Sequence, residues 1–252
     1  MKKPLLSIII TIYNEEKTVL PLLKRVYSHN VKGILKELII IESNSTDKSR
    51  KIVSAFVKNK KNIRLILQSK PNGKGSAVRE GLKYAKGDII LIQDGDLEYD
   101  VNDYEKLVRP IIDGKTKFVL GSRHLRHDGK TDWLIRKFKG KEMIYAHFMN
   151  FGGLFFHQLF NIVYGVHLTD PTTMYKVFRR DLLKNVHLEG QYFELDLEIV
   201  GKFIRLGYTP LEVPIKYVSR GNSEGKKVKF SRDVVRWIIT IFKVRFMPIK
   251  NL

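Results

Sequence analysis

Two aspartates separated by one glycine, Asp94, Gly95 and Asp96, stand at the end of the apolar run of residues 88–93. A run of this length and character is typical of a buried parallel strand. In open α/β sheets, ligands bind in the crevice at the carboxyl ends of the strands. Paired carboxylate oxygens there suit Mg²⁺ or Mn²⁺, which can neutralise a diphosphate. The alternative interpretation is an ordinary turn, because Asp-Gly is common turn chemistry.

The bulk composition limits the class of protein. With 252 residues, 43% of them hydrophobic, the chain is long enough to bury a full core in one domain. It has no cysteine, which excludes disulfides, zinc–thiolate sites and cysteine nucleophiles and is consistent with a reducing cytosol. Its 46 Lys and Arg against 26 Asp and Glu give a formal charge of +20. This balance indicates an anionic partner: a phosphorylated substrate, an anionic lipid or a nucleic acid.

Strands and helices alternate along the first half of the chain. The predicted strands are residues 5–12, 35–41, 63–67, 88–93 and 117–120, and amphipathic patterns of helical period lie between them. This alternation predicts βαβ units and a mostly parallel sheet. In the second half, the patterns predict helices at 143–164 and 191–206 and strands at 174–178 and 211–218. Pro214 places the last strand at an edge of the sheet.

Residues 231–246 form a broad amphipathic pattern near the end of the chain. Its polar stripe is basic, and apolar residues that include Trp and Phe surround it, as expected of a helix lying in a membrane interface. The alternative is a helix that packs on its own domain. We therefore divide the chain into a domain of residues 1–230 and a membrane-associating amphipathic helix within residues 231–252. The stripe consists of Arg232, Arg236, Thr240 and Lys243.

Neither a signal peptide nor a membrane-spanning segment is apparent. The apolar run of residues 5–10 has only the length of a strand. Residues 143–169 contain no Asp, Glu, Lys or Arg, but His, Asn, Gln and Gly interrupt them. We expect a cytoplasmic protein that associates peripherally with an anionic membrane surface, the cytoplasmic face of the membrane.

Several short segments together resemble the family-2 glycosyltransferases in their order and spacing, over roughly residues 5–245. Later segments, around Asp170 and from Arg220 to Lys227, look like the dolichol-phosphate mannosyltransferase branch of that family. The resemblance implies a GT-A fold, which is a single Rossmann-like α/β domain with a mostly parallel, mixed sheet, and an inverting reaction. The family segments are residues 11–15 (Thr-Ile-Tyr-Asn-Glu), the acidic turn at Glu42, residues 72–75 (Asn-Gly-Lys-Gly), residues 94–96 and residues 121–123 (Gly-Ser-Arg).

The resemblance assigns residues to the donor nucleotide. Thr11, Tyr13 and Glu15 would line it. Glu42 would accept a hydrogen bond from the base, although Ser43 stands where the family usually has a second acid. Lys74 would place one cation near the donor, with the neighbouring glycines allowing close approach of the backbone. As an alternative, Glu15 would simply complement the dipole of a helix N-terminus.

The resemblance also assigns the metal and its surroundings. Asp94, Asp96 and Glu98 would hold Mg²⁺ or Mn²⁺, with Glu98 in place of the more usual Gln. The metal would stabilise charge on the departing nucleoside diphosphate. Arg123 would clamp a phosphate with its planar guanidinium.

The acceptor side is assigned in the same way. Asp170 is the acid that the branch places near the acceptor, and its alternative role is a turn before a proline. Arg220, Ser223 and Lys226 would gather anionic oxygens of the diphosphate and of a lipid phosphate, unless they form a solvated basic loop. Glu194 is expected to face the site, and Asp196 to point elsewhere because the two differ in helical position.

These assignments favour transfer of one hexose from UDP- or GDP-hexose to a polyprenyl phosphate, dolichyl or undecaprenyl. A phosphate monoester is already ionised near neutral pH, so this acceptor needs cations and positioning more than a base. An alternative is a family-2 transferase acting on a glycan or protein hydroxyl, which would need Asp170 or Glu194 as a base. Another is a non-enzymatic, basic nucleic-acid-binding protein, which would leave the strand-end acids unexplained. We expect no nucleic-acid partner.

Overall fold

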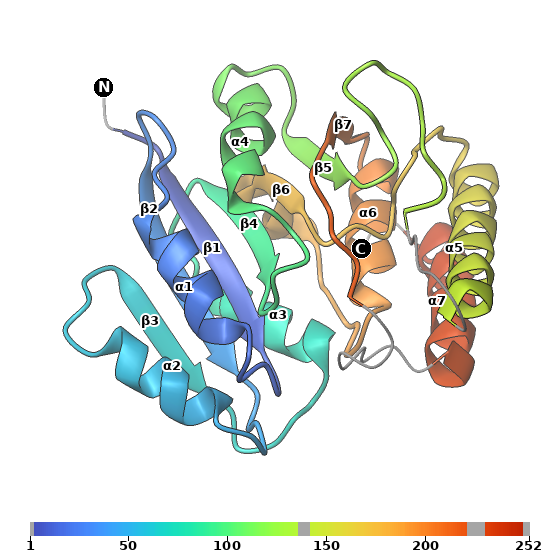
Figure 1. Ribbon diagram of the computed structural model, residues 1–252. Helices are drawn as coiled ribbons and strands as arrows, with labels where there is room; N and C mark the ends of the chain where they lie inside the picture. Colours follow the sequence, from blue (N-terminus) through green and yellow to red (C-terminus); the bar gives the residue numbers. More distant parts are fainter. Residues whose placement is uncertain (1–2, 136–141, 221–229, 249–252) are drawn as a thin grey trace.

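The computed structural model describes residues 3–135, 142–220 and 230–248. In these residues a seven-stranded sheet has the order β3-β2-β1-β4-β6-β5-β7 (Figure 1). All pairings are parallel except those of β6, which runs antiparallel to β4 and β5. The mostly parallel, mixed α/β sheet predicted from the sequence is therefore confirmed. The strands are β1 Leu5–Ile12, β2 Leu35–Glu42, β3 Ile63–Leu67, β4 Ile89–Asp94, β5 Phe118–Ser122, β6 Lys176–Arg179 and β7 Leu211–Pro214.

Helices cover the sheet and divide into two groups (Figure 1). The first group follows the parallel strands, with α1 against α2 and α3 across β1 and β2. The second group, α5, α6 and α7, gathers beyond β6 and β5, where α7 packs against both α5 and α6. The helices are α1 Val19–Ser28, α2 Ser49–Val57, α3 Lys74–Tyr84, α4 Tyr104–Ile112, α5 Glu142–Tyr164, α6 Leu195–Arg205 and α7 Phe230–Phe246, with short 3₁₀ turns at Val101–Asp103 and Arg180–Asn185.

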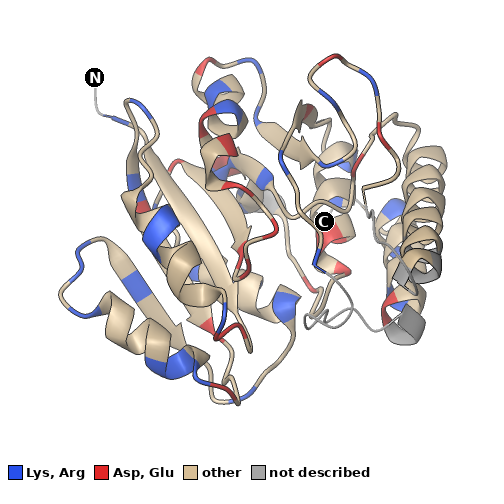
Figure 2. Cartoon of the chain, viewed as in Figure 1, with Lys and Arg blue, Asp and Glu red and all other residues tan. Residues whose placement is uncertain are grey.

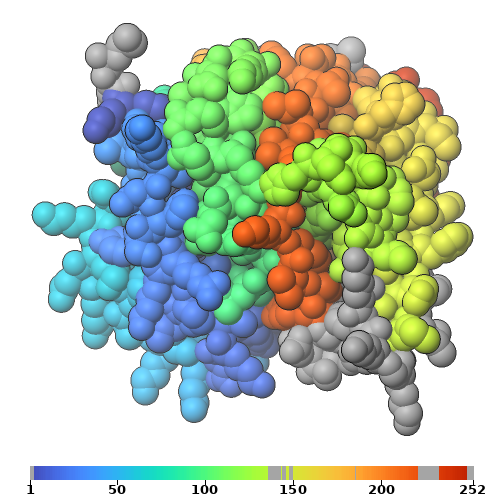
Figure 3. Space-filling model, turned by 45° about the horizontal axis from the view of Figure 1, so that its top comes forward, coloured from blue at the N-terminus to red at the C-terminus, as the bar shows by residue number. Residues whose placement is uncertain are grey.

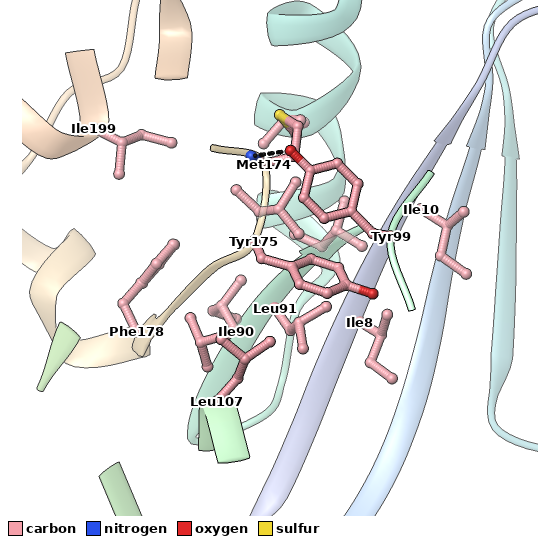
Figure 4. Packing of buried hydrophobic residues seen from close by; sticks show 14 of the residues in the cluster. Ile8, Ile10, Ile90, Leu91, Tyr99, Leu107, Met174, Tyr175, Phe178 and Ile199 are labelled. Atoms are coloured by element: carbon pink, nitrogen blue, oxygen red, sulfur yellow. Dashed lines mark hydrogen bonds between the residues drawn. The ribbon is translucent and has the colours of Figure 1, made fainter. Parts of the chain in front are cut away.

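A cluster of tyrosines in the core fixes the end of β4. Figure 4 shows Tyr99 and Tyr175 packed together, with the Tyr99 hydroxyl accepting a hydrogen bond from the Met174 backbone N–H at 3.1 Å. The hydroxyls of Tyr104 and Tyr175 both donate to the buried side-chain oxygen of Gln93, at 2.8 and 2.9 Å. Because Gln93 directly precedes Asp94, these two hydrogen bonds fix the position of the carboxyl end of β4.

The ends of two elements are set by local chemistry. The first helix, α1, begins at Val19 and does not include Asn14. Asn14 instead has a positive φ of 49°, and its side-chain oxygen accepts a hydrogen bond from the Thr46 backbone N–H at 2.8 Å. The last strand lies at the edge of the sheet as predicted, but it ends at Pro214, which cannot donate to a ladder.

After β7 the chain folds back over the turn that follows β4. The Lys216 backbone N–H donates to the Asp103 carboxylate at 2.7 Å, and that of Val218 donates to the Glu98 carbonyl at 2.9 Å. Figure 3 shows this segment, in orange, lying between α4 in green and the loop after β5 in lime. The fold-back brings Arg220 to the end of β4.

One side of the C-terminal helix α7 packs on the rest of the domain, and the predicted contact of α7 with a membrane stays a prediction. Ile241 and Val244 are buried, and Tyr164 of α5 donates a hydrogen bond to the Ile241 carbonyl at 3.1 Å. Arg205 of α6 donates to the Val244 carbonyl at 2.7 Å. Among the described residues, no helix combines the length and the apolar character that crossing a bilayer requires.

Candidate active site

A cavity of about 680 Å³ runs from the carboxyl ends of β1 and β4 to the space between α5 and α7. We call its two parts the charged end and the apolar end. The charged end is lined by Thr11, Tyr13, Glu15, Ser43, Lys74, Asp94, Asp96, Glu98, Arg123, Asp196 and Arg220. The apolar end is lined by Gly152, Gly153 and Phe156 of α5 and by Val234 and Trp237 of α7, together with the polar residues Asn150, His157 and Asp233.

Asp94 is the last residue of β4 and faces the charged end. Its carboxylate is held by the ammonium of Lys74 at 2.6 Å. Lys74 is the first residue of α3, and Gly73 before it has a φ of +92°. A side chain at Gly73 would overlap the backbone of Gln191, so glycine is required there for close packing. Lys74 therefore lies beside the strand-end acids. Its contact with the donor stays a prediction.

Arg220 joins three acids of the charged end. Its guanidinium lies 2.6 Å from Asp96, 2.9 Å from Glu15 and 3.3 Å from Glu98. Glu98 also accepts a hydrogen bond from the Tyr217 hydroxyl at 2.6 Å. The predicted metal acids thus face one cavity from a single turn, and an arginine from the far end of the sequence bridges them.

The carboxylates at this turn offer oxygen ligands of the kind that a hard divalent cation binds, but Asp94, Asp96 and Glu98 do not gather as a group of three ligands in the described residues, where Arg220 contacts Asp96 and Glu98. Their assignment as metal ligands stays a prediction. Burial, followed by the negative charges of Asp94 and Glu98, raises the pKa of Asp96 to about 7, although Arg220 opposes the shift. Carboxylates that repel one another in a buried site gain from a cation, and oxygen ligands are those that Mg²⁺ and Mn²⁺ prefer. The space beside them is large enough to admit a nucleotide sugar next to the ion.

The residues expected at the nucleotide divide into two groups. Thr11, Tyr13 and Glu15 line the cavity. Glu42 is fully buried, and its carboxylate binds the Arg50 side chain and accepts a hydrogen bond from the Ser45 backbone N–H at 2.7 Å. The neighbouring Ser43 lines the cavity instead. A contact between Glu42 and a base stays a prediction.

Arg123 and Asp170 form a tight pair at the wall of the cavity. Arg123 Nε and Nη2 each lie 2.7 Å from one oxygen of the fully buried Asp170 carboxylate. Burial alone would raise the pKa of Asp170, but the charge and hydrogen bonds of Arg123 hold it well below its usual range. Arg123 lines the cavity, whereas Asp170 lies behind it. The structure thus places Asp170 where it orients Arg123.

His124 and His157 lie close to Asp170, and the three could be taken for a metal site. His157 Nε2 is 3.7 Å from the Asp170 carboxylate. Both oxygens of that carboxylate accept hydrogen bonds from Arg123. The two histidines and Asn150 were not singled out from the sequence, because isolated polar residues in an apolar helix or loop give no motif.

The structure also distinguishes the two acids near the start of α6. Glu194 accepts hydrogen bonds from the backbone N–H groups of Gln191 and Tyr192, at 2.9 and 3.1 Å. Asp196, which we expected to point elsewhere, lines the cavity. Its carboxylate lies 3.2 Å from the ammonium of Lys176. Sequence spacing separates the two acids into different faces, but only the packing of α6 decides which face meets the cavity.

The remaining acceptor residues are only partly placed. Arg220 lies in the charged end, as described above. Ser223 and Lys226 fall outside the described residues, and their assignment to a phosphate stays a prediction.

The sequence is similar to those of known glycosyltransferases. The family model described as "Glycosyl transferase family 2" matches residues 7–186. A dolichyl-phosphate beta-glucosyltransferase of Trichomonas vaginalis is 27% identical, over 97% of this chain and 74% of its own length. The dolichol-phosphate mannosyltransferase of Pyrococcus furiosus is 26% identical, over 94% of this chain and 63% of its own length.

Among solved structures, the fold matches that of glucosyl-3-phosphoglycerate synthase from Mycobacterium tuberculosis, in complex with Mn²⁺, uridine diphosphate and glucosyl-3-phosphoglycerate. The TM-score is 0.69 at 19% identity, over 97% of this chain and 81% of that chain. At this identity the likeness concerns the fold. The GT-A architecture and the family that the motifs predicted are both confirmed.

Proposed function

The chain belongs to glycosyl transferase family 2 and is a glycosyltransferase, and we propose that it transfers one hexose from UDP- or GDP-hexose to a polyprenyl phosphate. One observation carries the proposal: a single cavity connects a cluster of acids and cations with an apolar space between two helices. We expect a nucleotide sugar to occupy the charged end. The phosphate of a polyprenyl phosphate would lie at the junction of the two ends, with its hydrocarbon chain in the apolar end. The similarity to dolichyl-phosphate and dolichol-phosphate sugar transferases supports this acceptor.

The charged end provides the groups that a nucleoside diphosphate needs. Asp94, Asp96 and Glu98 would hold Mg²⁺ or Mn²⁺, which would supply positive charge to the leaving diphosphate. Lys74 and the N-terminus of the eleven-residue α3 helix face the same space, where backbone N–H groups and the helix dipole favour phosphate. Arg220 adds a guanidinium that can exchange a carboxylate partner for a phosphate oxygen.

The acceptor requires positioning more than proton removal. The phosphate of a polyprenyl phosphate is ionised near neutral pH, so its oxygen can attack the anomeric carbon directly, with inversion. Arg123 presents its planar guanidinium to the cavity, and Asp170 fixes its orientation from behind. Neither Asp170 nor Glu194, the acids considered as bases for a hydroxyl acceptor, lines the cavity. Neither of these two acids is therefore placed to act as a base on a hydroxyl acceptor.

The outer faces of α5 and α7 supply a surface for lipid. Phe151 and Ile162 of α5 are 74% and 78% exposed, and Phe246 of α7 is 73% exposed. Figure 2 shows α5 almost free of charged residues, whereas Lys243 and Arg245 mark the last turn of α7. Exposed aromatic and aliphatic side chains beside cations are typical of a peripheral contact with an anionic membrane. These side chains support the proposal that the enzyme associates peripherally with an anionic membrane surface.

A two-phase assay tests the proposal. Purified protein is incubated with Mn²⁺, labelled UDP-glucose or GDP-mannose, and polyprenyl phosphate in detergent, and the organic phase is counted. We expect label in the organic phase with one donor, and none with polyprenol, which lacks the phosphate. Label that stays in the aqueous phase with both donors, or that moves equally onto polyprenol, would contradict the proposed acceptor.

A further inference from the structure

Two ion pairs lie in the wall of the charged end, the first half-buried and the second buried, and the proposed function uses only the first. The first is Lys74 with Asp94, and the second is Lys176 with Asp196. Lys176 is fully buried at the start of β6 and also donates to the Thr173 carbonyl. Replacing a buried ion pair by apolar residues is often neutral or stabilising. The second pair is therefore poorly explained by stability alone.

Asp196 presents an acceptor to the cavity. Its Oδ1 faces Lys176, and none of the residues that the structure describes donates a hydrogen bond to its Oδ2. Asp196 itself lines the cavity. Burial raises the pKa of Asp196, but Lys176 and Lys74 oppose the shift and favour the ionised form. A ligand that donates hydrogen bonds would satisfy the carboxylate.

The position of Asp196 is fixed relative to the phosphate-binding elements. The Ser76 backbone N–H of α3 donates to the Gln191 carbonyl at 3.0 Å. Glycine at position 75 lets this segment approach, because a side chain there would overlap the Gly190 carbonyl. The ring of Phe193 lies under the Lys74 ammonium, 5.2 Å from it. These contacts hold the start of α6 against the start of α3.

The hexose of a nucleotide sugar is bonded to the second phosphate, so it must lie next to the groups that hold the diphosphate. Hexose hydroxyls are donors, and an ionised carboxylate is the strongest acceptor among side chains. On the basis of the proposed function, we infer that Asp196 accepts hydrogen bonds from hydroxyls of the donor hexose, and that Lys176 is a positioning residue that holds its carboxylate from behind. The discrimination between hexoses would then reside at Asp196, because a site built to bind a hydroxyl rejects a sugar that lacks it.

Binding measurements without any acceptor test this inference. Calorimetry with Mn²⁺ compares UDP with UDP-glucose and GDP with GDP-mannose for wild type and for Asp196→Asn. We expect the variant to bind the nucleoside diphosphate within about twofold of wild type, while affinity for the nucleotide sugar falls about ten- to a hundredfold. A monodeoxy donor that lacks the contacted hydroxyl should bind both proteins alike.

Controls separate the contact from general damage. The surface pair of Lys117 and Asp181 provides matched substitutions, Asp181→Asn and Lys117→Met, which should change no affinity. Lys176→Met should reproduce the sugar-specific loss, and Lys176→Arg should restore part of it. A purely structural role would instead lower affinity for diphosphate and sugar together.

Three outcomes would overturn the inference. Equal losses for diphosphate and nucleotide sugar would assign Asp196 to the diphosphate or to stability. A sugar-specific loss in Glu194→Gln but not in Asp196→Asn would move the contact to Glu194. Unchanged affinity of Asp196→Asn for both the nucleoside diphosphate and the nucleotide sugar would show that Asp196 does not contact the donor hexose. Because no acceptor is present, the result stands apart from the two-phase assay, which can fail while the hexose contact holds.

Discussion

The two ends of the cavity are built in different ways. The charged end takes three of its acids from one turn, residues 94–98, and one cation, Lys74, from the start of α3, the helix that precedes β4 in the sequence. The apolar end depends on contact between α5 and α7, whose lining residues are 152–156 and 234–237. The chemistry of the donor is therefore encoded in short local motifs. The chemistry of the acceptor is encoded in how two distant helices pack.

The largest expected effect concerns the charged end alone. Asp96→Ala should lower kcat by about a thousandfold or more, because charge on the departing diphosphate loses its stabilising cation. The fold should persist, since the side chain packs against other polar groups and not in the apolar core. Turnover and thermal unfolding are measured together, with the exposed Asp128→Ala as the control. Turnover at the wild-type rate would remove Asp96 from the metal site.

The difference between the two ends of the cavity explains which site residues could be predicted from the sequence. Asp94 and Asp96 follow a strand end, so their periodic surroundings place them without tertiary information, whereas Glu98 and Lys74 were assigned by the family resemblance. Arg220 reaches the acids only because the chain folds back after β7, and nothing in its local sequence encodes that path. Local spacing also misjudged Asp196, since the rotation of α6 is set by packing against α7 and the start of α3.

A substitution in the apolar end should affect the acceptor and leave the donor untouched. A Cβ added at Gly153 meets no atom within 4 Å, so a leucine there would project into the space between α5 and α7. Gly153→Leu should raise KM for polyprenyl phosphate by about tenfold or more, because the hydrocarbon chain loses room. Gly153→Ala is the smaller control. Equal weakening of Mn²⁺-dependent donor binding would show that the ends are not separable.

We expect the affinity of the charged end for Mn²⁺ to depend on pH. Burial and the charges of Asp94 and Glu98 raise the pKa of Asp96 to about 7. A protonated carboxyl is a poor ligand, so Mn²⁺ affinity should fall as the pH drops below about 7, approaching tenfold per pH unit for one proton. Calorimetry at several pH values measures the slope, and Asp96→Asn should flatten it.

The raised pKa of Asp96 also affects the stability of the metal-free protein. As the pH rises, Mn²⁺ binding becomes stronger, but the metal-free protein becomes less stable. Folded Asp96 binds its proton more tightly than in the unfolded chain, where the pKa is 3.8. Its contribution to the free energy of unfolding is therefore favourable at low pH and is lost as the pH rises from about 4 to about 7. Excess Mn²⁺ should reverse this loss at neutral pH, because it binds the ionised acids of the native state. Unfolding midpoints with and without Mn²⁺ across this range check both signs.

The smallest expected effect lies on the outer faces of α5 and α7. Deleting residues 231–252 would weaken liposome partitioning but would also expose the core around Ile241, so it cannot separate membrane contact from folding. Phe151→Ser and Phe246→Ser change side chains that already face solvent, and each should lower partitioning onto anionic vesicles by several-fold through lost apolar burial. Leu67→Ser, an exposed apolar residue on β3, is the matched control and should leave partitioning unchanged. If Phe151→Ser and Phe246→Ser both partition like wild type, the faces of α5 and α7 do not contact lipid. The acceptor would then need another route into the apolar end of the cavity.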